Sequence, residues 1–560
     1  MAERRYALGL DYGTNSVRAL IVDVTTGEEI ATAVHEYTRG DQGVLSDPDN
    51  PHVARQHVAD YHEGLEAAVN GAVQAASGAP GFSAAQIIGI GVDTTGSTPI
   101  PVDSEGVPLC MRPEFEGNPN ALAWLWKDHS SMAEAEAITA AAAEMRPHYL
   151  QRCGGVYSSE WFFSKLWRCL TIDREVFEAA HSWVEFCDYI PALLVGDLRP
   201  DRIQRSVCAA GHKAMYADDW GGLPDREFLN ALNPALGALR PRLFERAYPA
   251  GLRAGTLCRD WAERLGLRPG IGVSVGAFDA HMGAVGAGVG LGTLVKIIGT
   301  SSCDITVAAP DSAAGDIPGV CGVVRGSVLP GYWGVEAGQS AVGDIFNWFV
   351  TQICGGNASF HATLTSQADA LQPGESGLLA LDWNNGNRTV LVDARLTGLL
   401  VGQTLRTSQA EVYRALIEAT AFGSHTILNR MREYGVTVDR VVACGGIAEK
   451  NPMLMQIYAD VDGQPISVTR SSQTCALGAA IFGAVAAGPD EGGYPDTETA
   501  QKAMASGVSC TYHPNTANAP VYRQLYGLYK RLHDSFGVAG HSDCLADVMK
   551  RLLEIQQQAA

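Results

Sequence analysis

A strand, a short turn and a second strand occur near the start of the chain and again near its middle. In residues 6–23 an apolar run leads into DYGT at 11–14, and apolar and polar residues then alternate. In residues 294–308 an apolar run leads into GTSS at 299–302, and a second alternating run follows. Period-two alternation around a short turn predicts a hairpin. Because the unit recurs, we expect two related halves that face each other.

The two turns have the composition of phosphate-binding turns. Each combines a glycine with hydroxyl side chains, and the first also carries the carboxylate of Asp11. Glycine lets backbone N–H groups approach an anion closely, and Asp11 could orient a hydrated Mg²⁺. Two such turns across a cleft could hold a triphosphate. A surface hairpin that only uses favourable turn residues explains DYGT equally well.

The length and the order of the elements indicate two α/β domains. With 560 residues the chain is too long for one hydrophobic core. Strand-like runs alternate with helical ones, which is typical of an α/β protein. We therefore place one domain at residues 1–288 and a second at residues 289–560.

Several helices and one further turn can be placed on the chain. Long helices are expected at 411–431 and 474–488, with a strand between them that leads into ACGGIAEKN at 443–451. Serine is a favoured N-cap residue, so we expect Ser158 or Ser159 to begin another helix.

The charge and the cysteines narrow the range of partners. A formal net charge of -20 argues against nucleic acid or an anionic membrane as the main partner. The N-terminus enters a strand instead of a signal-peptide core, so we expect a cytoplasmic protein. The 13 cysteines include no C-x-x-C pair, which favours free thiols over a disulfide framework or a zinc site. P-loop, G-x-G-x-x-G and H-E-x-x-H motifs are also absent from the sequence.

DYGT, GTSS and ACGGIAEKN resemble the two phosphate motifs and the adenosine motif of the actin-like ATPase fold. Within that fold the chain is similar to the FGGY family of carbohydrate kinases, whose C-terminal signature fits residues 398–423. The similarity extends over nearly the whole chain. It implies two ribonuclease H-like α/β domains that face each other across a cleft for ATP and a sugar.

Segments such as GVDTTGSTPIPVD, AGHKAMY and GAFDAHMGAVGAG resemble the family members that phosphorylate L-ribulose. Members acting on glycerol or xylulose usually carry an arginine two residues after the aspartate of a W-x-D segment, whereas here Asp128 is followed by His129 and Ser130. The resemblance implies ATP-dependent conversion of L-ribulose to L-ribulose 5-phosphate in L-arabinose catabolism. A kinase for D-ribulose or ribitol, and a non-catalytic actin-like ATPase, are the alternatives.

The resemblance assigns the sugar side of the site to five residues. Asp279 would be the general base that accepts the proton of the sugar hydroxyl, and the sugar would contact Gly96, Trp126, Lys213, Asp279 and Glu336. Taken alone, Asp279 could be a helix cap, Lys213 a solvent-facing lysine on a strand, and Glu336 a member of a loop salt bridge. Gly96 has no Cβ, so the sugar could lie against backbone there.

The resemblance also assigns the nucleotide side. The ATP contacts would be Asp11, Gly13, Thr14, Asn15, Gly299, Thr300, Ser301, Gly445, Gly446 and Asn451, with Asp11 at the Mg²⁺. A Gly-Gly pair taken alone is a common turn. His281 and His129 show no partner in the sequence, and we treat both as structural. Dimers occur among relatives, so a homodimer is compatible with the resemblance.

Overall fold

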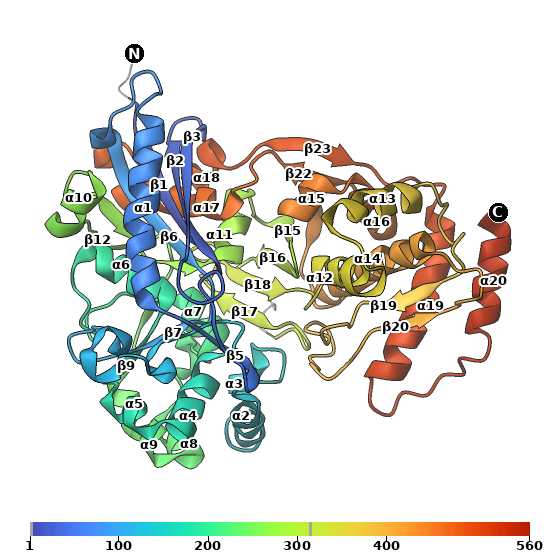
Figure 1. The fold of residues 1–560 in the computed structure, drawn as a ribbon, viewed down its shortest axis with the longest axis horizontal. Coiled ribbons are helices and arrows are strands. Elements are labelled where there is room, and N and C mark those ends of the chain that lie inside the picture. Colours follow the sequence, from blue (N-terminus) through green and yellow to red (C-terminus); the bar gives the residue numbers. More distant parts are fainter. Residues whose placement is uncertain (1–3, 313–315, 560) are drawn as a thin grey trace.

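The computed structural model describes residues 4–312 and 316–559. Two sheets lie in two lobes: the first is in the lobe at the left of Figure 1, and the second lies toward the middle, with α19 and α20 at the opposite end. The first sheet contains β1 (Tyr6–Tyr12), β2 (Ser16–Asp23), β3 (Glu29–Glu36), β6 (Ile87–Thr94), β12 (Arg253–Thr256), β13 (Gly272–Ser274) and β14 (Ala277–Phe278). The second contains β15 (Gly292–Ile298), β16 (Ser302–Ala308), β17 (Gly322–Arg325), β18 (Trp333–Ala337), β21 (Val438–Cys444), β22 (Ile466–Thr469) and β23 (Val508–Tyr512).

The two sheets share one topology. The first follows the order β3-β2-β1-β6-β13-β12 and the second the order β18-β16-β15-β21-β22-β23, with β17 beyond β18. In both, the first three strands pair antiparallel, the next two join in parallel, and the edge strand is antiparallel again. This repetition confirms the two related halves that the sequence predicts.

Smaller strands and the helices surround these sheets. The remaining strands are β4 (Leu45–Asp47), β5 (Asn50–Gln56), β7 (Pro99–Val102), β8 (Ala123–Trp124), β9 (Ser182–Glu185), β10 (Arg205–Ser206), β11 (Ala247–Tyr248), β19 (Leu379–Leu381) and β20 (Leu399–Val401). The helices of the first half are α1 (Val58–Ala76), α2 (Met132–Met145), α3 (His148–Gln151), α4 (Phe162–Ile172), α5 (Arg174–Ala179), α6 (Phe186–Val195), α7 (Val207–Lys213), α8 (Arg226–Leu232), α9 (Pro234–Leu239), α10 (Arg259–Leu265) and α11 (Asp279–Gly286). Those of the second are α12 (Gly343–Trp348), α13 (Ala358–Asp369), α14 (Gln409–Glu433), α15 (Gly446–Lys450), α16 (Pro452–Asp462), α17 (Thr474–Ala487), α18 (Thr497–Met504), α19 (Ala519–Gly537) and α20 (Val548–Ala559).

Both predicted hairpins are present. The β1–β2 turn is closed by the Gly13 N–H, which donates to the Ser16 carbonyl at 2.9 Å. The β15–β16 turn is closed in the same way, from the Gly299 N–H to the Ser301 carbonyl at 2.9 Å. Asp11 lies two residues before Gly13, whereas Ile297 holds the corresponding position before Gly299. Only the first half therefore brings a carboxylate to its turn.

Helix α17 belongs to the second half of the sequence but packs on the sheet of the first. A Cβ on Gly91 of β6 would lie 1.8 Å from the Ala479 carbonyl oxygen of α17, and a Cβ on Gly478 would lie 1.8 Å from the Met282 oxygen of α11. Because glycine lets the backbones touch, the helix seats directly on β6 and α11. One buried cluster accordingly includes Leu20 and Ile481 together. A domain boundary at residue 288 stays a prediction.

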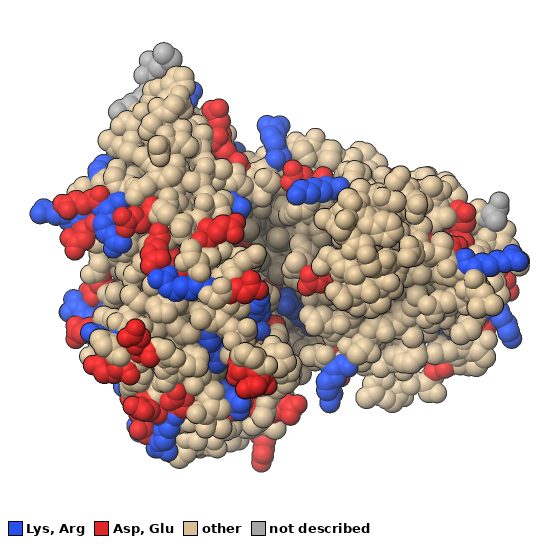
Figure 2. Space-filling model, viewed as in Figure 1, with Lys and Arg blue, Asp and Glu red and all other residues tan. Residues whose placement is uncertain are grey.

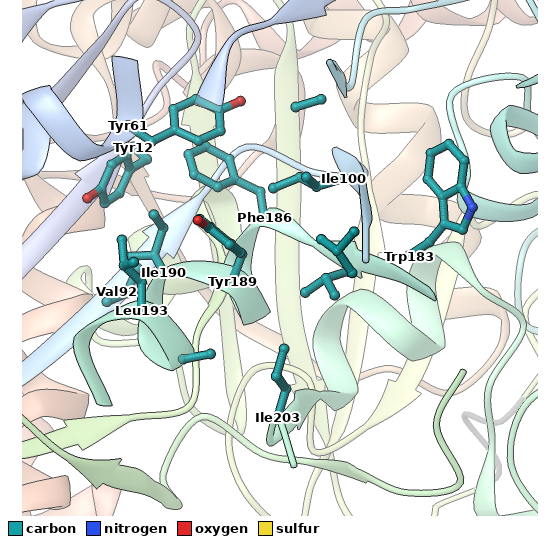
Figure 3. Packing of buried hydrophobic residues seen from close by; sticks show 14 of the residues in the cluster. Tyr12, Tyr61, Val92, Ile100, Trp183, Phe186, Tyr189, Ile190, Leu193 and Ile203 are labelled. Carbon is teal, nitrogen blue, oxygen red and sulfur yellow. The ribbon is translucent and has the colours of Figure 1, made fainter. Parts of the chain in front are cut away.

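An aromatic core supports the end of β1. Tyr61 of α1 stacks on Phe186 of α6 with ring centroids 3.8 Å apart, and Tyr12 meets Phe186 edge-on at 5.2 Å. Figure 3 shows these rings beside Val92 of β6 and Ile190 of α6. Tyr12 directly follows Asp11, so this packing fixes the backbone that presents Asp11 to the cleft.

The predicted long helices are confirmed, but one predicted helix start is wrong. Helix α4 begins at Phe162 with Trp161 in the N-cap position and no side-chain cap bond. The Ser158 hydroxyl instead accepts the Glu160 N–H at 3.1 Å in a local turn. Trp161 is 5% exposed, so burial of its ring decides where the helix starts.

All 13 cysteines are free. Within residues 4–312 and 316–559, none of the helices has both the length and the apolar composition needed to span a bilayer.

Candidate active site

Three carboxylates meet at one edge of the first sheet. Asp11 is the next-to-last residue of β1 and lies opposite Asp93 in the parallel ladder with β6. Strand β14 pairs with the same Asp93 and leads directly into Asp279, the first residue of α11. Asp93 is fully buried, and neither of its carboxylate oxygens has a hydrogen-bond partner in the described part of the chain. Burial raises the pKa of Asp93 well above its usual value, and the neighbouring Asp11 and Asp279 raise it further. A cluster of three carboxylates, one of them fully buried, is suited to binding a cation.

Asp279 has the properties of a general base at neutral pH. Its Oδ1 accepts the Ala280 N–H at 2.7 Å, which leaves Oδ2 for another partner. Burial raises its pKa from the usual 3.8 to about 7, and the charge of Asp11 adds to the effect. A carboxylate with a pKa near the operating pH accepts a proton efficiently while still being substantially ionised.

The first turn is held by side chains from several elements. The Thr14 carbonyl accepts Gln56 Nε2 at 2.7 Å, and the Thr14 hydroxyl accepts the indole N–H of Trp126 at 3.0 Å. The Asn15 amide donates to the Gln42 carbonyl at 2.8 Å. Trp126, expected at the sugar, therefore contacts the first turn.

The first turn also carries an ion pair. Arg18 Nη1 lies 3.1 Å from Asp11 Oδ2, and both side chains are partly accessible. A cation that binds Asp11 would compete with Arg18 for this oxygen.

The second turn is braced by the start of α12. The Thr300 carbonyl accepts the Val342 N–H at 2.7 Å and the Asp344 N–H at 3.1 Å, and the Gly299 carbonyl accepts the Gly343 N–H at 3.1 Å. Thr300 itself is exposed and Ser301 is half-buried. The turn is therefore rigid in its backbone while its side chains remain accessible.

The predicted adenosine turn packs against the end of β15. Gly445 has φ +95°, and a Cβ there would lie 2.6 Å from the Ile298 carbonyl oxygen, so only glycine fits. A Cβ on Gly446 would meet no atom within 4 Å, which leaves room for a flat ligand. Asn451 Oδ1 caps α16 by accepting the Leu454 N–H at 3.0 Å. That bond gives Asn451 a structural role and leaves its amide nitrogen for a ligand.

Cys475 places the nucleotide side close to the carboxylates. This residue lies in the first turn of α17, and burial raises its thiol pKa well above the usual value. The charges of Asp11, Asp93 and Asp279 raise it further, and Cys444 at the end of β21 acts in the same direction. The carboxylates and the end of β21 therefore both lie near Cys475. Figure 2 shows the surface hollowed between the two lobes.

Lys213 and Glu336 form a buried ion pair between the halves. Lys213 ends α7 and is 8% exposed, so the view of it as a solvent-facing lysine on a strand is wrong. Its Nζ lies 3.6 Å from Glu336 Oε1 of β18 and above the rings of Trp161 and Phe278. Burial alone would raise the pKa of Glu336, but the charge of Lys213 acts together with those of neighbouring basic groups, and their sum holds that pKa below the usual range. The pair is therefore charged.

Gly96 packs against the ring of Phe278, which gives a reason for glycine that the sequence does not show. A Cβ at this position would lie 1.7 Å from the ring of Phe278. The ring of the residue directly before Asp279 thus occupies the space that any larger side chain would need. Glycine is required here by protein packing, whatever the sugar adds.

Sequence reasoning missed the two buried side chains that anchor the Gly96 loop. Lys165 Nζ donates to the carbonyls of Ser97 and Leu125, both at 2.8 Å, and burial lowers its pKa to about 8. Glu185 accepts the Thr98 N–H at 2.8 Å and also binds the Ser97 hydroxyl. A lysine on an amphipathic helix gives no sequence signal that it is buried, so this support could not be found.

A second missed feature is an electrostatic interaction between the two halves. Burial would raise the pKa of Glu160 of the first half, but the charge of Arg388 of the second half acts together with His129 and two lysines, and their sum lowers that pKa. Arg388 also acts on Glu336. His281, treated as structural from the sequence, lies 3.6 Å from Glu336 Oε2. These interactions involve residues that are far apart in the chain, and no local motif marks them.

Relatives of known sequence match nearly the whole chain. The model of the N-terminal domain of the FGGY family of carbohydrate kinases matches residues 6–286, and that of the C-terminal domain matches residues 294–487. A ribulokinase from Vibrio parahaemolyticus is 43% identical over 550 residues, covering 94% of this chain and 95% of the relative. A ribulokinase from Shouchella clausii is 43% identical over 574 residues, covering 99% of each.

Solved structures agree on the fold. A xylulose kinase from Rhodospirillum rubrum matches with a TM-score of 0.73 at 23% identity, covering 95% of this chain and 99% of that one. A glycerol kinase from Plasmodium falciparum, solved with ADP, matches with a TM-score of 0.74 at 14% identity, covering 96% and 99%. The fold is that of two actin-like, ribonuclease H-like ATPase domains. On the combined evidence of the family models and the relatives, the chain belongs to the FGGY family of carbohydrate kinases.

Proposed function

We propose that this protein transfers the γ-phosphoryl group of ATP to O5 of L-ribulose, giving L-ribulose 5-phosphate and ADP in the catabolism of L-arabinose. The observation that carries the proposal is the placement of Lys213, Glu336 and Asp279 together between the two halves. The names of the relatives that match the full length support ribulose as the sugar.

In this proposal the chain's own residues divide the work. Lys213 and Glu336 hold the sugar by donating to and accepting from its oxygens. Asp279 accepts the proton of the 5-hydroxyl as the O5–P bond forms and the bond from the γ-phosphorus to the bridging oxygen breaks. Because the transition state of phosphoryl transfer is loose, positioning of the hydroxyl matters more than a strong base.

The nucleotide would lie between the two turns. In this proposal, backbone N–H groups and hydroxyls of Thr14, Thr300 and Ser301 would bind the phosphates, and the adenosine would lie against Gly446. The fully buried, unpartnered carboxylate of Asp93 beside Asp11 fits a divalent cation. Mg²⁺ held by Asp11 would supply charge neutralisation of the transferring phosphoryl group.

The position of the phosphate on the product tests the proposal. The purified protein is incubated with Mg-ATP and L-ribulose, and the product is examined by ¹H–³¹P correlation NMR. We expect phosphorus coupling to the protons on C5 and release of one ADP per phosphate transferred. Coupling to the protons on C1, or ATP consumption without a sugar phosphate, would overturn the assignment.

In this proposal the reaction takes place in the cytoplasm, where ATP and free sugar are available. We further propose that two copies of the chain form a homodimer. Light scattering of the purified protein tests the assembly. A mass of twice the 59.4 kDa of one chain supports the dimer, and a mass of one chain refutes it.

A further inference from the structure

Two buried histidines contact the carboxylate of Glu336. His212 and His281 are 1% and 2% exposed, and their Nε2 atoms lie 3.0 Å apart. His212 Nδ1 lies 3.3 Å from Glu336 Oε2, and His281 Nε2 lies 3.6 Å from the same oxygen. The proposed mechanism uses Lys213 and Glu336 Oε1 but neither histidine.

The protons of this cluster can be assigned from the contacts. Burial lowers the pKa of His281 to about 4 and that of His212 well below its usual value, so both rings are neutral and each has one N–H. A contact between two Nε2 atoms needs one proton, and a carboxylate needs a donor. Both needs are met only if His212 carries its proton on Nδ1 and His281 carries its own on Nε2. His281 then donates to His212, and His212 faces Glu336 with an N–H.

The backbone is shaped to admit this arrangement. Gly322 of β17 lies opposite Glu336 in the ladder with β18, and a Cβ there would lie 2.0 Å from His212 Nδ1. The imidazole therefore occupies the space that a side chain at position 322 would fill. At 3.3 Å the His212–Glu336 contact does not meet hydrogen-bond geometry within the described residues. Catalytic contacts of this kind often align only when substrate binds.

We propose that His212 and His281 are positioning residues that fix Glu336 Oε2 and thereby present Oε1, with Lys213, to the sugar. The inference rests on the proposed function of this pocket. His281 lies two residues after Asp279 on α11, whereas Glu336 lies on β18 of the other half. The pair therefore links the helix that carries the base to the strand that carries the sugar contact.

The same cluster has the composition of a metal site. Cys208, His212 and His281 each offer one ligand atom, and these atoms lie within 4.8 Å of one another. Burial raises the pKa of the Cys208 thiol, which opposes the thiolate that a metal ligand requires. A hydrogen bond accounts for the 3.0 Å contact between the rings, so we favour the positioning role and treat zinc binding as an outcome of the test.

Steady-state kinetics of histidine variants test the proposal. Leucine at position 212 removes both nitrogens, so His212→Leu should raise KM for the sugar at least about tenfold and change KM for ATP less than about twofold. His212→Asn keeps a donor near the Nδ1 position and should bring the sugar KM back to within about threefold of wild type. Cys208→Ala, which touches only the metal alternative, should leave both constants unchanged.

Direct observation of the tautomer gives an independent test that needs no kinetic assay and does not depend on the folding of His212→Leu. Long-range ¹H–¹⁵N correlation spectra of the wild-type protein should show one histidine protonated on Nδ1, and its signal should disappear in His212→Asn. Three results would each overturn the inference. The first is an unchanged KM for the sugar in His212→Leu, and the second is a proton on His212 Nε2. The third is a His212→Asn variant that has the wild-type melting temperature but does not recover the KM for the sugar. Inhibition by micromolar Zn²⁺ that Cys208→Ala abolishes would overturn it in favour of a metal site.

Failure of the inference can be told apart from failure of the proposed function. The variants are assayed with whichever ketopentose or pentitol gives wild type its highest kcat/KM. A different preferred sugar contradicts the L-ribulose assignment, while the ratio of variant to wild-type KM still decides the role of the histidines. If wild type phosphorylates no sugar, the proposed function fails and the tautomer alone decides.

Discussion

Replacement of Asp279 by asparagine separates proton transfer from sugar binding. The amide keeps the size of the side chain, and its oxygen can still accept the Ala280 N–H that Asp279 Oδ1 accepts at 2.7 Å. The start of α11 should therefore be preserved. What the variant loses is the group that receives the proton of the sugar hydroxyl.

The size of the loss follows from the role. General-base catalysis contributes about 10² to 10⁴ in rate, which at about 1.4 kcal/mol per factor of ten is about 3 to 5 kcal/mol. We expect this loss in kcat, while the dissociation constant of L-ribulose changes less than about tenfold because Lys213 and Glu336 remain. Asp260→Asn, an exposed carboxylate on α10, is the matched control and should have wild-type kinetics.

The raised pKa of Asp279 predicts how kcat/KM changes with pH. Burial and Asp11 raise the pKa of Asp279 to about 7, and only the ionised carboxylate can accept a proton. In the free enzyme, kcat/KM should therefore rise as pH increases toward about 7 and level off above it, and Asp279→Asn should lack this limb. The assay is ADP release followed by a coupled enzyme, with binding measured by calorimetry. More than about a tenth of wild-type kcat in Asp279→Asn would refute the role of general base.

Three further variants address the remaining parts of the account. Asp11→Ala should lower kcat at least about a hundredfold, while its calorimetric affinity for L-ribulose should stay within about threefold of wild type. Near-normal kinetics with Mg-ATP would mean that DYGT is a hairpin turn with no catalytic role. Lys213→Ala should raise KM for the sugar by a larger factor than it lowers kcat. Lys127→Ala, at an exposed position, should change neither constant. The same change of KM in both variants would contradict a specific contact between Lys213 and the sugar. Gly91→Ala places a Cβ 1.8 Å from a carbonyl oxygen of α17 and should lower the free energy of unfolding, measured in urea, by about 3 kcal/mol. The control is Gly527→Ala at an exposed position of α19, which should raise the free energy of unfolding by up to about 1 kcal/mol. A stable Gly91→Ala would mean that α17 does not seat on the sheet.

Local pattern was enough to predict the strands and turns on which the site is built. Alternation in residues 16–23 and 302–308 predicts both hairpins, although most residues of β2 and β16 are buried on both faces of the sheet. Helix α14 is predicted from its periodicity, and its capping box at Ser408 and Glu411 is present. In these elements local preference and tertiary packing agree.

Contacts between distant segments could not be predicted in the same way. Lys165 is buried because the carbonyls of Ser97 and Leu125 come to it from two other loops. Whether His281 is structural or part of the site depends on His212 and Glu336, which lie on other elements. The resemblance to a family supplied the positions of the site residues, but only the folded chain gives the partners that set their pKa values.

The substrate preference tests the central claim most directly. The ratio kcat/KM is measured with Mg-ATP for L-ribulose, D-ribulose, L- and D-xylulose, ribitol and glycerol under one set of conditions. The account predicts the highest value for L-ribulose. A value at least about tenfold higher for glycerol or D-xylulose would contradict it.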